Sequence, residues 1–347
     1  MGSSTDYTDY AEGGGIRKEK NSFDSMTTRS LSVYARNVIG ALIIDKPQGF
    51  TSHDVVARVR RAIGTRRVGH TGTLDPFATG VLVCCIGRAT RLVQFLVGLD
   101  KAYIGTVRLG YATDTQDATG KQIAPLRTSK ELSLEELRKT LSAFVGQQLQ
   151  TPPMFSAKKV GGKRLYEAAR QGLELAREPV SIVVHSIELG EGDPDVLRSN
   201  EDGTCDFTIR VCCSSGTYIR TLADDIGRSL GVGGHLTSLR RLRVGHFDLN
   251  DALTLEELES GSRAELEAEL LDGSRMVSHL PRVVLDKERV SLISNGRQIS
   301  LSESEAKSIE GWSGLLGLCD PEGRLVGIGE QDPVDALVRP RVVLTGE

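Results

Sequence analysis

Residues 69–80 read Gly-His-Thr-Gly-Thr-Leu-Asp-Pro-Phe-Ala-Thr-Gly and place one carboxylate, that of Asp75, in a loop between two apolar stretches. The three glycines allow a tight turn and a close approach of the backbone to a ligand, and Pro76 fixes the turn just after the acid. A carboxylate framed in this way is available as a nucleophile or a base. An ordinary Asp-Pro turn has the same local composition, so the neighbouring motifs decide between the two interpretations.

Three further motifs accompany this loop. The sequence reads GALIIDKPQGFTS at Gly40–Ser52, KAY at Lys101–Tyr103 and SGTYIR at Ser215–Arg220. In their order and spacing, the four segments resemble those of the bacterial tRNA pseudouridine-55 synthases, the pseudouridine synthase B family. The resemblance runs from about Val38 to the C-terminus, and the loop around Asp75 is its most specific part.

The resemblance implies an α+β fold. In this family, a pseudouridine-synthase catalytic domain has a mixed, largely antiparallel central sheet flanked by helices, and a small C-terminal β-rich PUA-like domain binds RNA. We expect the catalytic domain over residues 36–275 and the PUA-like domain over residues 276–347, where short apolar runs alternate with turns. Residues 1–35 have almost no apolar periodicity and are predicted to form a disordered leader.

Local patterns predict several elements of the catalytic domain. A helix is expected to begin at Thr51 or Ser52 and to end at Gly64, with its valines on one face. Two further helices are predicted from the capping boxes Ser133/Glu136 and Thr254/Glu257. The remaining elements are strands at 38–45, 81–86 and 101–109, a helix at 89–97, and a helix from about Gly216 that carries Arg220.

Residues 151–175 differ in character from their surroundings. They combine Pro152-Pro153 and Gly161-Gly162 with basic and aromatic side chains. Such a segment suits a mobile element that clamps nucleic acid, although an ordinary surface excursion could have the same composition. In the family, the matching segment is a thumb-like insertion that closes on the tRNA arm, which implies RNA contacts for Lys158, Lys163 and Arg164.

The formal net charge of −3 hides an asymmetry along the chain. Residues 36–130 hold 14 Lys and Arg against 6 Asp and Glu, a local excess of +8, whereas residues 251–275 and 302–335 each hold 2 against 8. A basic face on the motif-bearing region is compatible with phosphate binding, because the local field steers a polyanion. A solvated charged surface without a partner would give the same count.

Composition excludes several classes of protein. No stretch approaches the roughly 18 apolar residues of a membrane span, and the N-terminus lacks the apolar segment of a secretory signal, so we expect a cytoplasmic protein. The six cysteines show neither zinc-ligand spacing nor a secreted framework and are interpreted as small buried hydrophobes. Converting uridine to pseudouridine involves no net redox change and no added atom, so no cofactor or metal is expected.

The resemblance assigns the chemistry to three residues. Asp75 matches the catalytic aspartate of the family. Arg220 matches the arginine that pairs with this carboxylate, and a cation is needed because enclosure would otherwise favour the protonated acid. Tyr103 matches the tyrosine that stacks on the target base and is the favoured acceptor of a ribose proton in a pathway through a glycal. Attack of the aspartate on the sugar and attack on the base ring remain open alternatives.

Four further residues match substrate contacts of the family. Tyr218 matches a second active-site tyrosine, and Leu239 matches an apolar substrate contact. His70 matches the histidine that lies against the everted uridine, although a histidine beside glycines is more often a hydrogen-bonded turn residue. Lys46 belongs to a motif near the active site, where we expect a supporting role.

The resemblance thus predicts an enzyme that isomerises uridine 55 in the T-loop of tRNA, by N-glycosidic cleavage, base rotation and C-glycosidic rejoining. We expect a monomer that binds the tRNA T-arm and needs no membrane and no protein partner. The alternative is a non-catalytic tRNA-binding or RNA-folding chaperone on the same scaffold. A subunit of a guide-RNA ribonucleoprotein is disfavoured by the bacterial wording of the motifs, and the P-loop-like Gly64–Thr71 carries His70 where the phosphate-binding lysine is required.

Overall fold

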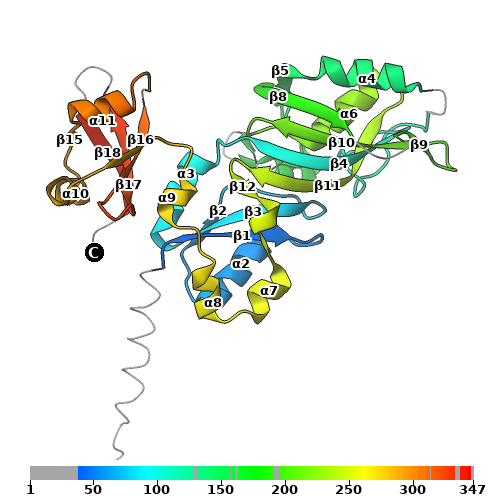
Figure 1. Ribbon diagram of the computed structural model, residues 1–347. Coiled ribbons are helices and arrows are strands. Elements are labelled where there is room, and N and C mark those ends of the chain that lie inside the picture. Colours follow the sequence, from blue (N-terminus) through cyan, green and yellow to red (C-terminus); the bar gives the residue numbers. More distant parts are fainter. Residues whose placement is uncertain are drawn as a thin grey trace, which may run out of the picture. The chain divides into compact units, whose positions relative to one another are not determined.

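The computed structural model describes residues 38–127, 132–156, 158–160, 163–190, 196–312, 314–332 and 337–344 (Figure 1). Residues Val38–Glu347 form one compact unit. The leader predicted for residues 1–35 lies outside the described residues.

Eleven strands of the described residues form one large sheet. Its order is β13 (Leu253–Thr254), β1 (Gly40–Lys46), β3 (Thr79–Ile86), β11 (Gly234–Val244), β4 (Lys101–Leu109), β10 (Cys205–Cys213), β8 (Val180–Leu189) and β5 (Gly146–Gln150). The short strands β2 (Val68–His70), β9 (Arg198–Ser199) and β12 (Phe247–Asp248) pair with β3, β10 and β11. Among these pairs, β1 with β13 and β3 with β11 are parallel and the others antiparallel, which confirms the predicted mixed, largely antiparallel sheet.

Both faces of β1 and β3 are buried, because successive side chains of a strand point to opposite faces. Leu42, Ile44 and Leu82 pack against α2 (Ser52–Ile63) and against α7 (Leu255–Ser260) and α8 (Arg263–Ala268). Figure 1 shows these three helices together beside β1. As predicted, α2 begins after Thr51, whose side chain accepts from the Asp54 amide, and ends at Gly64 in the left-handed conformation.

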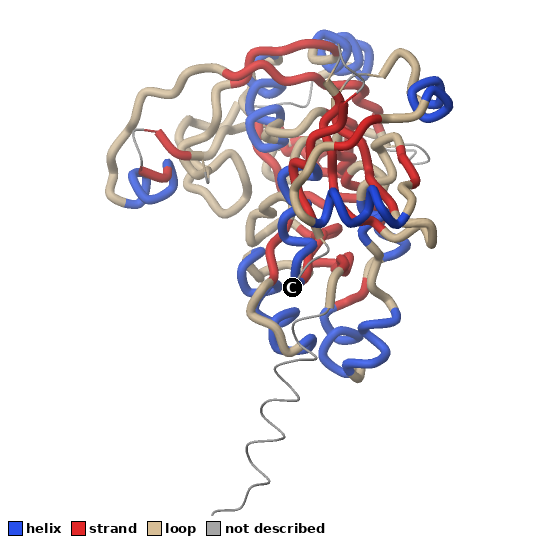
Figure 2. Tube along the Cα trace, turned by 90° about the vertical axis from the view of Figure 1, so that its left-hand side faces the viewer, coloured by secondary structure: helices blue, strands red, loops and turns tan. Residues whose placement is uncertain are grey.

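A second core lies under the other half of the sheet. The inward side chains of β4, β8 and β10 pack against α4 (Leu134–Ala143) and α6 (Ile219–Ser229). In the tube view of Figure 2 the helices lie around the strands. The capping residues predicted for α4 and for α7 are both present. Ser133 accepts from the Glu136 amide at the start of α4, and Thr254 accepts from the Glu257 amide at the start of α7.

Two helical boundaries differ from the sequence prediction. The prediction of one continuous helix at residues 89–97 is wrong. The chain forms a 3₁₀ helix, η1 (Gly87–Leu92), followed by a single α-turn, α3 (Val93–Leu96). The apolar side chains Ala89, Leu92 and Leu96 are nevertheless buried, so the spacing signals burial without fixing the type of helix. The helix carrying Arg220 begins at Ile219, because Tyr218 is still extended.

A separate β-rich sheet follows near the C-terminus. Its order is β14 (Arg282–Val284), β16 (Leu315–Cys319), β17 (Leu325–Gln331), β18 (Leu337–Val343) and β15 (Ile299–Ser300). Helices α10 (Lys287–Ser294) and α11 (Glu303–Ser308), which the sequence analysis did not predict, lie beside it (Figure 1). The sheet shares a core with β1 and β3 that includes Met276 of α9 (Gly273–Met276). Arg88 and Arg91 also donate to the carbonyls of Leu344 and Val343.

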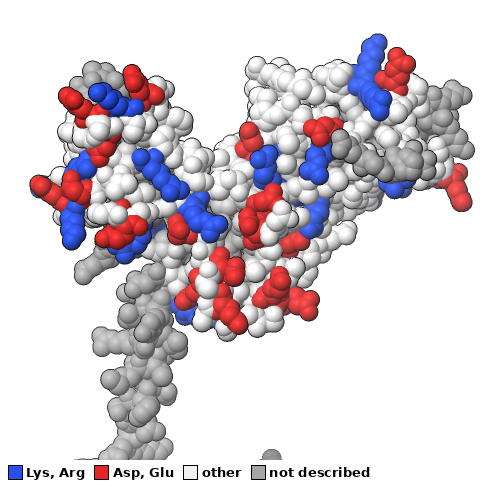
Figure 3. Space-filling model, in the orientation of Figure 1, with Lys and Arg blue, Asp and Glu red and all other residues white. Residues whose placement is uncertain are grey.

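The excess positive charge of residues 36–130 is partly neutralised by acids from distant segments. Arg58 pairs with Glu259, and Arg108 forms two bonds of 2.7 and 2.8 Å to Asp206. On the face shown in Figure 3, basic and acidic side chains are intermingled. The count along the sequence therefore overstates the positive charge that a polyanion would meet on this face.

Candidate active site

A cavity of about 320 Å³ opens beside the loop that carries Asp75. This volume lies at the lower end of the range typical of small-molecule sites. Its lining comes from the loop after β2, the start of β4, the start of α6, and β11. The lining residues are Thr71, Gly72, Thr73, Leu74, Asp75, Val97, Lys101, Tyr103, Ser156, Gly216, Thr217, Tyr218, Ile219, Arg220, Leu239 and Arg241.

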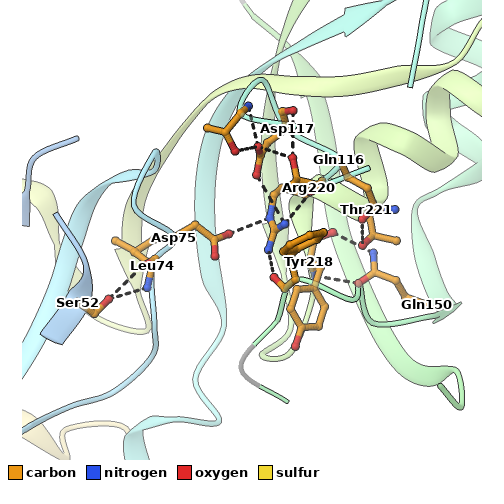
Figure 4. A network of polar contacts seen from close by, with 12 residues as sticks. Ser52, Leu74, Asp75, Gln116, Asp117, Gln150, Tyr218, Arg220 and Thr221 are labelled. Carbon is orange, nitrogen blue, oxygen red and sulfur yellow. Dashed lines mark hydrogen bonds and ion pairs between the residues drawn. The ribbon is translucent and has the colours of Figure 1, made fainter. Parts of the chain in front are cut away.

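Asp75 and Arg220 form an ion pair at the wall of this cavity (Figure 4). Arg220 Nε lies 2.8 Å from Asp75 Oδ2. The arginine side chain is 4% exposed, whereas that of the aspartate is 37% exposed. The cation is therefore fixed in the protein interior, and the carboxylate stands at the boundary between protein and cavity.

The other donors of the Arg220 guanidinium are also occupied. Nη1 donates to the carbonyl of Thr115 and Nη2 to that of Phe155, each at 2.8 Å. Nη1 also lies 3.6 Å from Oδ2 of the buried Asp117. These contacts with Thr115, Asp117 and Phe155 hold the guanidinium, so its Nε–H is presented to Asp75 in a fixed direction.

Asp117 is a site residue that the sequence analysis missed. Its Oδ1 accepts from the hydroxyl of Thr115 at 2.8 Å and from the amide of Thr119 at 2.9 Å (Figure 4). The run DTQDAT at residues 114–119 signals such local hydrogen bonds, but the approach of Arg220 to this turn follows from tertiary packing alone.

Two side chains hold the loop of Asp75 in place, that of Ser52 at the start of α2 and that of Lys46 at the end of β1. The Ser52 hydroxyl accepts from the Leu74 amide at 2.9 Å and donates to the Leu74 carbonyl at 3.2 Å. The fully buried Lys46 donates to the carbonyls of Pro47, Phe50 and, at 3.4 Å, Pro76. Lys46 thus joins the end of β1 to the residue that follows Asp75.

The environment of Asp75 favours the protonated acid. Burial raises the pKa of Asp75 above its usual value, Arg220 opposes this shift, and the negative charge of Asp117 adds to it. The ionised form of Asp75 consequently depends on the guanidinium at 2.8 Å. This is the electrostatic relation that the sequence analysis expected of the two residues.

Gln150 fixes the start of α6. Its side-chain amide donates to the Tyr218 carbonyl at 3.0 Å, and its side-chain oxygen accepts from the Tyr218 amide at 2.8 Å (Figure 4). Tyr218 is the N-cap residue of α6 and has no side-chain capping bond. The paired bonds from Gln150 therefore position Tyr218, which lines the cavity two residues before Arg220.

Tyr103 and Arg241 both line the cavity. Tyr103 is 7% exposed, and burial raises the pKa of its phenol while the positive charge of Arg241 opposes that rise. Arg241 is 1% exposed and donates to the carbonyls of Val81 and Gly72 at 2.8 and 3.0 Å. Arg241 is another residue that the sequence analysis did not assign; its position two residues after Leu239 on a strand was the available signal.

Gly80 makes this arrangement possible. It pairs with Arg241 across the parallel β3–β11 ladder and has a φ of 100°. A Cβ at this position would lie 2.1 Å from the Arg241 carbonyl oxygen. Only glycine allows the two backbones to approach so closely beside the loop of Asp75.

Some of the substrate-contact residues predicted from the sequence do not line the cavity, and the side chains of others lie outside the described residues. Leu239 and Tyr218 line the cavity, but His70 does not belong to its lining. The His70 Nδ1 accepts from the Gly72 amide at 3.2 Å, so His70 is a hydrogen-bonded turn residue. Burial lowers its pKa, which favours the neutral ring. Lys158 is partly exposed, whereas the side chains of Lys163 and Arg164 are outside the described residues.

The thumb-like segment begins next to the cavity. Ser156 lines the cavity, and the backbone continues into the hairpin β6 (Lys159–Val160) and β7 (Lys163–Arg164) and the helix α5 (Leu165–Arg170). The carbonyl of Phe155 binds Arg220. The base of this segment is thus attached to the same guanidinium as Asp75.

The described residues contain no group of three His, Cys, Asp or Glu side chains that could hold a metal ion. The six cysteines are free, and five of them are buried, as interpreted from the sequence. None of the described helices has the length and apolar character needed to cross a membrane.

Comparison with known proteins agrees with these features. Residues 60–219 match the N-terminal domain of the TruB family pseudouridylate synthases, and residues 220–289 match the C-terminal domain of tRNA pseudouridylate synthase B. The chain is 43% identical over 310 residues to tRNA pseudouridine synthase B of Aromatoleum aromaticum, covering 89% of this chain and 94% of that protein. It is 43% identical to the protein of the same name from Heliobacterium modesticaldum over 309 residues, which are 88% of this chain and 95% of the relative.

Solved structures share the fold at lower identity. A Cbf5-Nop10-Gar1 complex contains a chain that matches with a TM-score of 0.65 and 24% identity, covering 91% of this chain and 87% of the other. The archaeal box H/ACA sRNP Nop10-Cbf5 complex gives 0.63 and 24%, with coverage of 91% and 88%. The family matches extend over both the loop of Asp75 and the helix of Arg220. The chain is therefore a member of the TruB family of pseudouridylate synthases.

Proposed function

We propose that this enzyme isomerises uridine 55 in the T-loop of tRNA to pseudouridine, with Asp75 as the nucleophile. The observation that carries the proposal is the Asp75–Arg220 pair at the wall of a cavity in a chain of this family. Its relatives at 43% identity are named tRNA pseudouridine synthase B.

Each residue has a role that follows from its position. Asp75 Oδ2 is bound to Arg220, and Oδ1 accepts no hydrogen bond within the described residues, so Oδ1 is the oxygen available to the substrate. Tyr103, Tyr218 and Leu239 supply an apolar wall against which a uracil ring can stack. Exclusion of water from such a pocket strengthens the electrostatic contacts inside it and holds the cleaved base for rejoining.

The target uridine has to leave its stack before it can enter the cavity. Unstacking costs a few kcal/mol, which contacts with the flipped base and with the RNA backbone must offset. We assign the backbone contacts to the thumb-like segment at 151–175, including Lys158, Lys163 and Arg164, and to a PUA-like domain at 276–347. The connection of Phe155 to Arg220 would couple closure of this segment to the geometry of Asp75.

An in vitro conversion assay tests the proposal. Purified protein is incubated with an unmodified tRNA transcript, and pseudouridine is mapped chemically along the whole RNA. We expect one modified position, uridine 55, and no product from a transcript with cytidine at that position. Pseudouridine at another site would refute the positional assignment, and no pseudouridine at all would refute the catalytic one.

A further inference from the structure

The cavity contains more buried positive charge than its acids can balance. Arg241 is 1% exposed and Lys101 is 7% exposed, and neither forms an ion pair with any described carboxylate. Their hydrogen bonds go to neutral carbonyls, from Lys101 Nζ to Val97 at 3.1 Å and Leu99 at 2.6 Å, and from Arg241 to Val81 and Gly72. Buried cations without a counter-ion are costly, so such a pair beside a cavity indicates that an anion forms there.

The charge balance of the whole site agrees. Arg220 is shared between two carboxylates, those of Asp75 and Asp117. With the buried Lys46 counted as well, four buried cations face these two carboxylates, a formal surplus of two positive charges, and the other acids that act on the two lysines, Asp54 and Asp100, are exposed to solvent. Burial and, to a smaller extent, repulsion by the positive charge of Arg241 lower the pKa of Lys101 to about 8. Lys101 is therefore still mostly protonated at neutral pH.

The depth of these groups indicates which part of a nucleotide they meet. A flipped nucleotide enters base first and leaves its phosphates near the rim. Arg241 and Lys101 are almost fully buried, whereas the Asp75 side chain is 37% exposed. Gly72, Lys101 and Arg241 all line the cavity, and a Cβ built on Gly72 would lie 3.6 Å from Arg241 Nη1 and 3.8 Å from Lys101 Cε. Both cations thus border the region that the base reaches.

We propose that Lys101 and Arg241 are catalytic residues that stabilise the negative charge of the uracil ring after the glycosidic bond breaks. This inference rests on the proposed function. The N1–C1′ bond breaks and its electron pair leaves on the ring, where O2 and O4 share the charge. After rotation, C5 forms the new bond to C1′, and the proton lost from C5 balances the proton that N1 gains. Charge develops on the ring whether Asp75 attacks the sugar or the base, so the two cations serve either pathway.

Single-turnover kinetics with two substrates test this role. Lys101→Met keeps the length of the side chain and removes its charge, and Lys139→Met on the exposed face of α4 is the matched control. We expect Lys101→Met to lower the rate on tRNA by about tenfold to a hundredfold, with the Kd for tRNA within about threefold. On tRNA carrying 5-fluorouridine, the loss in the rate of 5-fluorouridine consumption should be clearly smaller, because fluorine itself stabilises the ring anion.

Three outcomes would overturn the proposal. The first is an equal loss of rate on both substrates, and the second is an unchanged rate. The third is a loss of tRNA affinity with no loss of rate, which would assign the cations to the RNA backbone. If Lys101→Met does not fold, as judged by circular dichroism, Arg241→Lys and Arg241→Met replace it, and the charge-retaining variant should stay closer to wild type. Failure of the proposed function is distinguishable, because the wild type would then form no pseudouridine.

Discussion

Replacement of Arg220 by glutamine is the most informative single change, because Arg220 controls the ionisation of Asp75. Two unit charges about 4 Å apart interact by about 4 kcal/mol at an effective dielectric constant of about 20. The Asp75 side chain is 37% exposed, so solvent screening reduces this to about 2 kcal/mol. Since about 1.4 kcal/mol corresponds to a factor of ten, the ionised fraction of Asp75 should fall by about thirtyfold wherever protonation competes.

The sign of the pH effect follows from the environment. Burial already raises the pKa of Asp75, so the wild-type rate should fall as the pH drops through that raised value. Removing the guanidinium raises the pKa of Asp75 further. Arg220→Gln should therefore lose activity at a higher pH than the wild type and recover part of it in alkaline solution.

The assay is the single-turnover rate of pseudouridine formation from pH 5 to 9 on the wild type and Arg220→Gln. Arg228→Gln is the matched control, since Arg228 lies on the same helix with a 71% exposed side chain. The control should follow the wild type at every pH. A constant ratio between Arg220→Gln and wild type across the whole range would show that Arg220 does not act through the ionisation of Asp75, and would refute this reasoning.

Three further changes test how the site is held. Gln150→Ala leaves the amide and carbonyl of Tyr218 without their partners, which should cost about 1–3 kcal/mol in the free energy of unfolding by denaturant titration and lower the turnover rate. Ser52→Ala removes both bonds to Leu74 and should slow turnover severalfold while tRNA affinity stays unchanged, so an equal loss of affinity would contradict its role. Gly80→Ala places a Cβ 2.1 Å from a β11 carbonyl at a φ of 100° and should destabilise the protein by at least about 2 kcal/mol in a thermal melt; an unchanged Tm would contradict the packing argument.

Local chemistry explains which elements could be predicted from the sequence. Helix α2 has its own cap at Thr51, an apolar stripe, and a glycine stop at Gly64. The strand Lys101–Leu109 has a clear alternation and appears with the predicted bounds. Helices α10 and α11 were missed because they are eight and six residues long and have weak patterns. Their capping residues, Asp286 and Ser302, were signals that strand-like neighbours obscured.

The site divides in the same way. Asp75 and Arg220 could be named from motifs, because both belong to short segments with a family-specific wording. Asp117 and Gln150 could not, because their roles depend on contacts with residues distant in the sequence. Asp117 contacts Arg220, about 100 positions away, and Gln150 contacts Tyr218, about 70 positions away. Lys101 belongs to the KAY motif and Arg241 follows Leu239 by two residues, but only burial without a carboxylate partner among the described residues marks these cations as unusual.

The central claim is that the Asp75 carboxylate performs the chemistry on tRNA. The most direct test compares wild type and Asp75→Asn for pseudouridine formation at uridine 55 and for tRNA binding in the same buffer. We predict no detectable product from the variant and a Kd within about tenfold of wild type. Pseudouridine formation by Asp75→Asn at a rate near that of the wild type would contradict the claim.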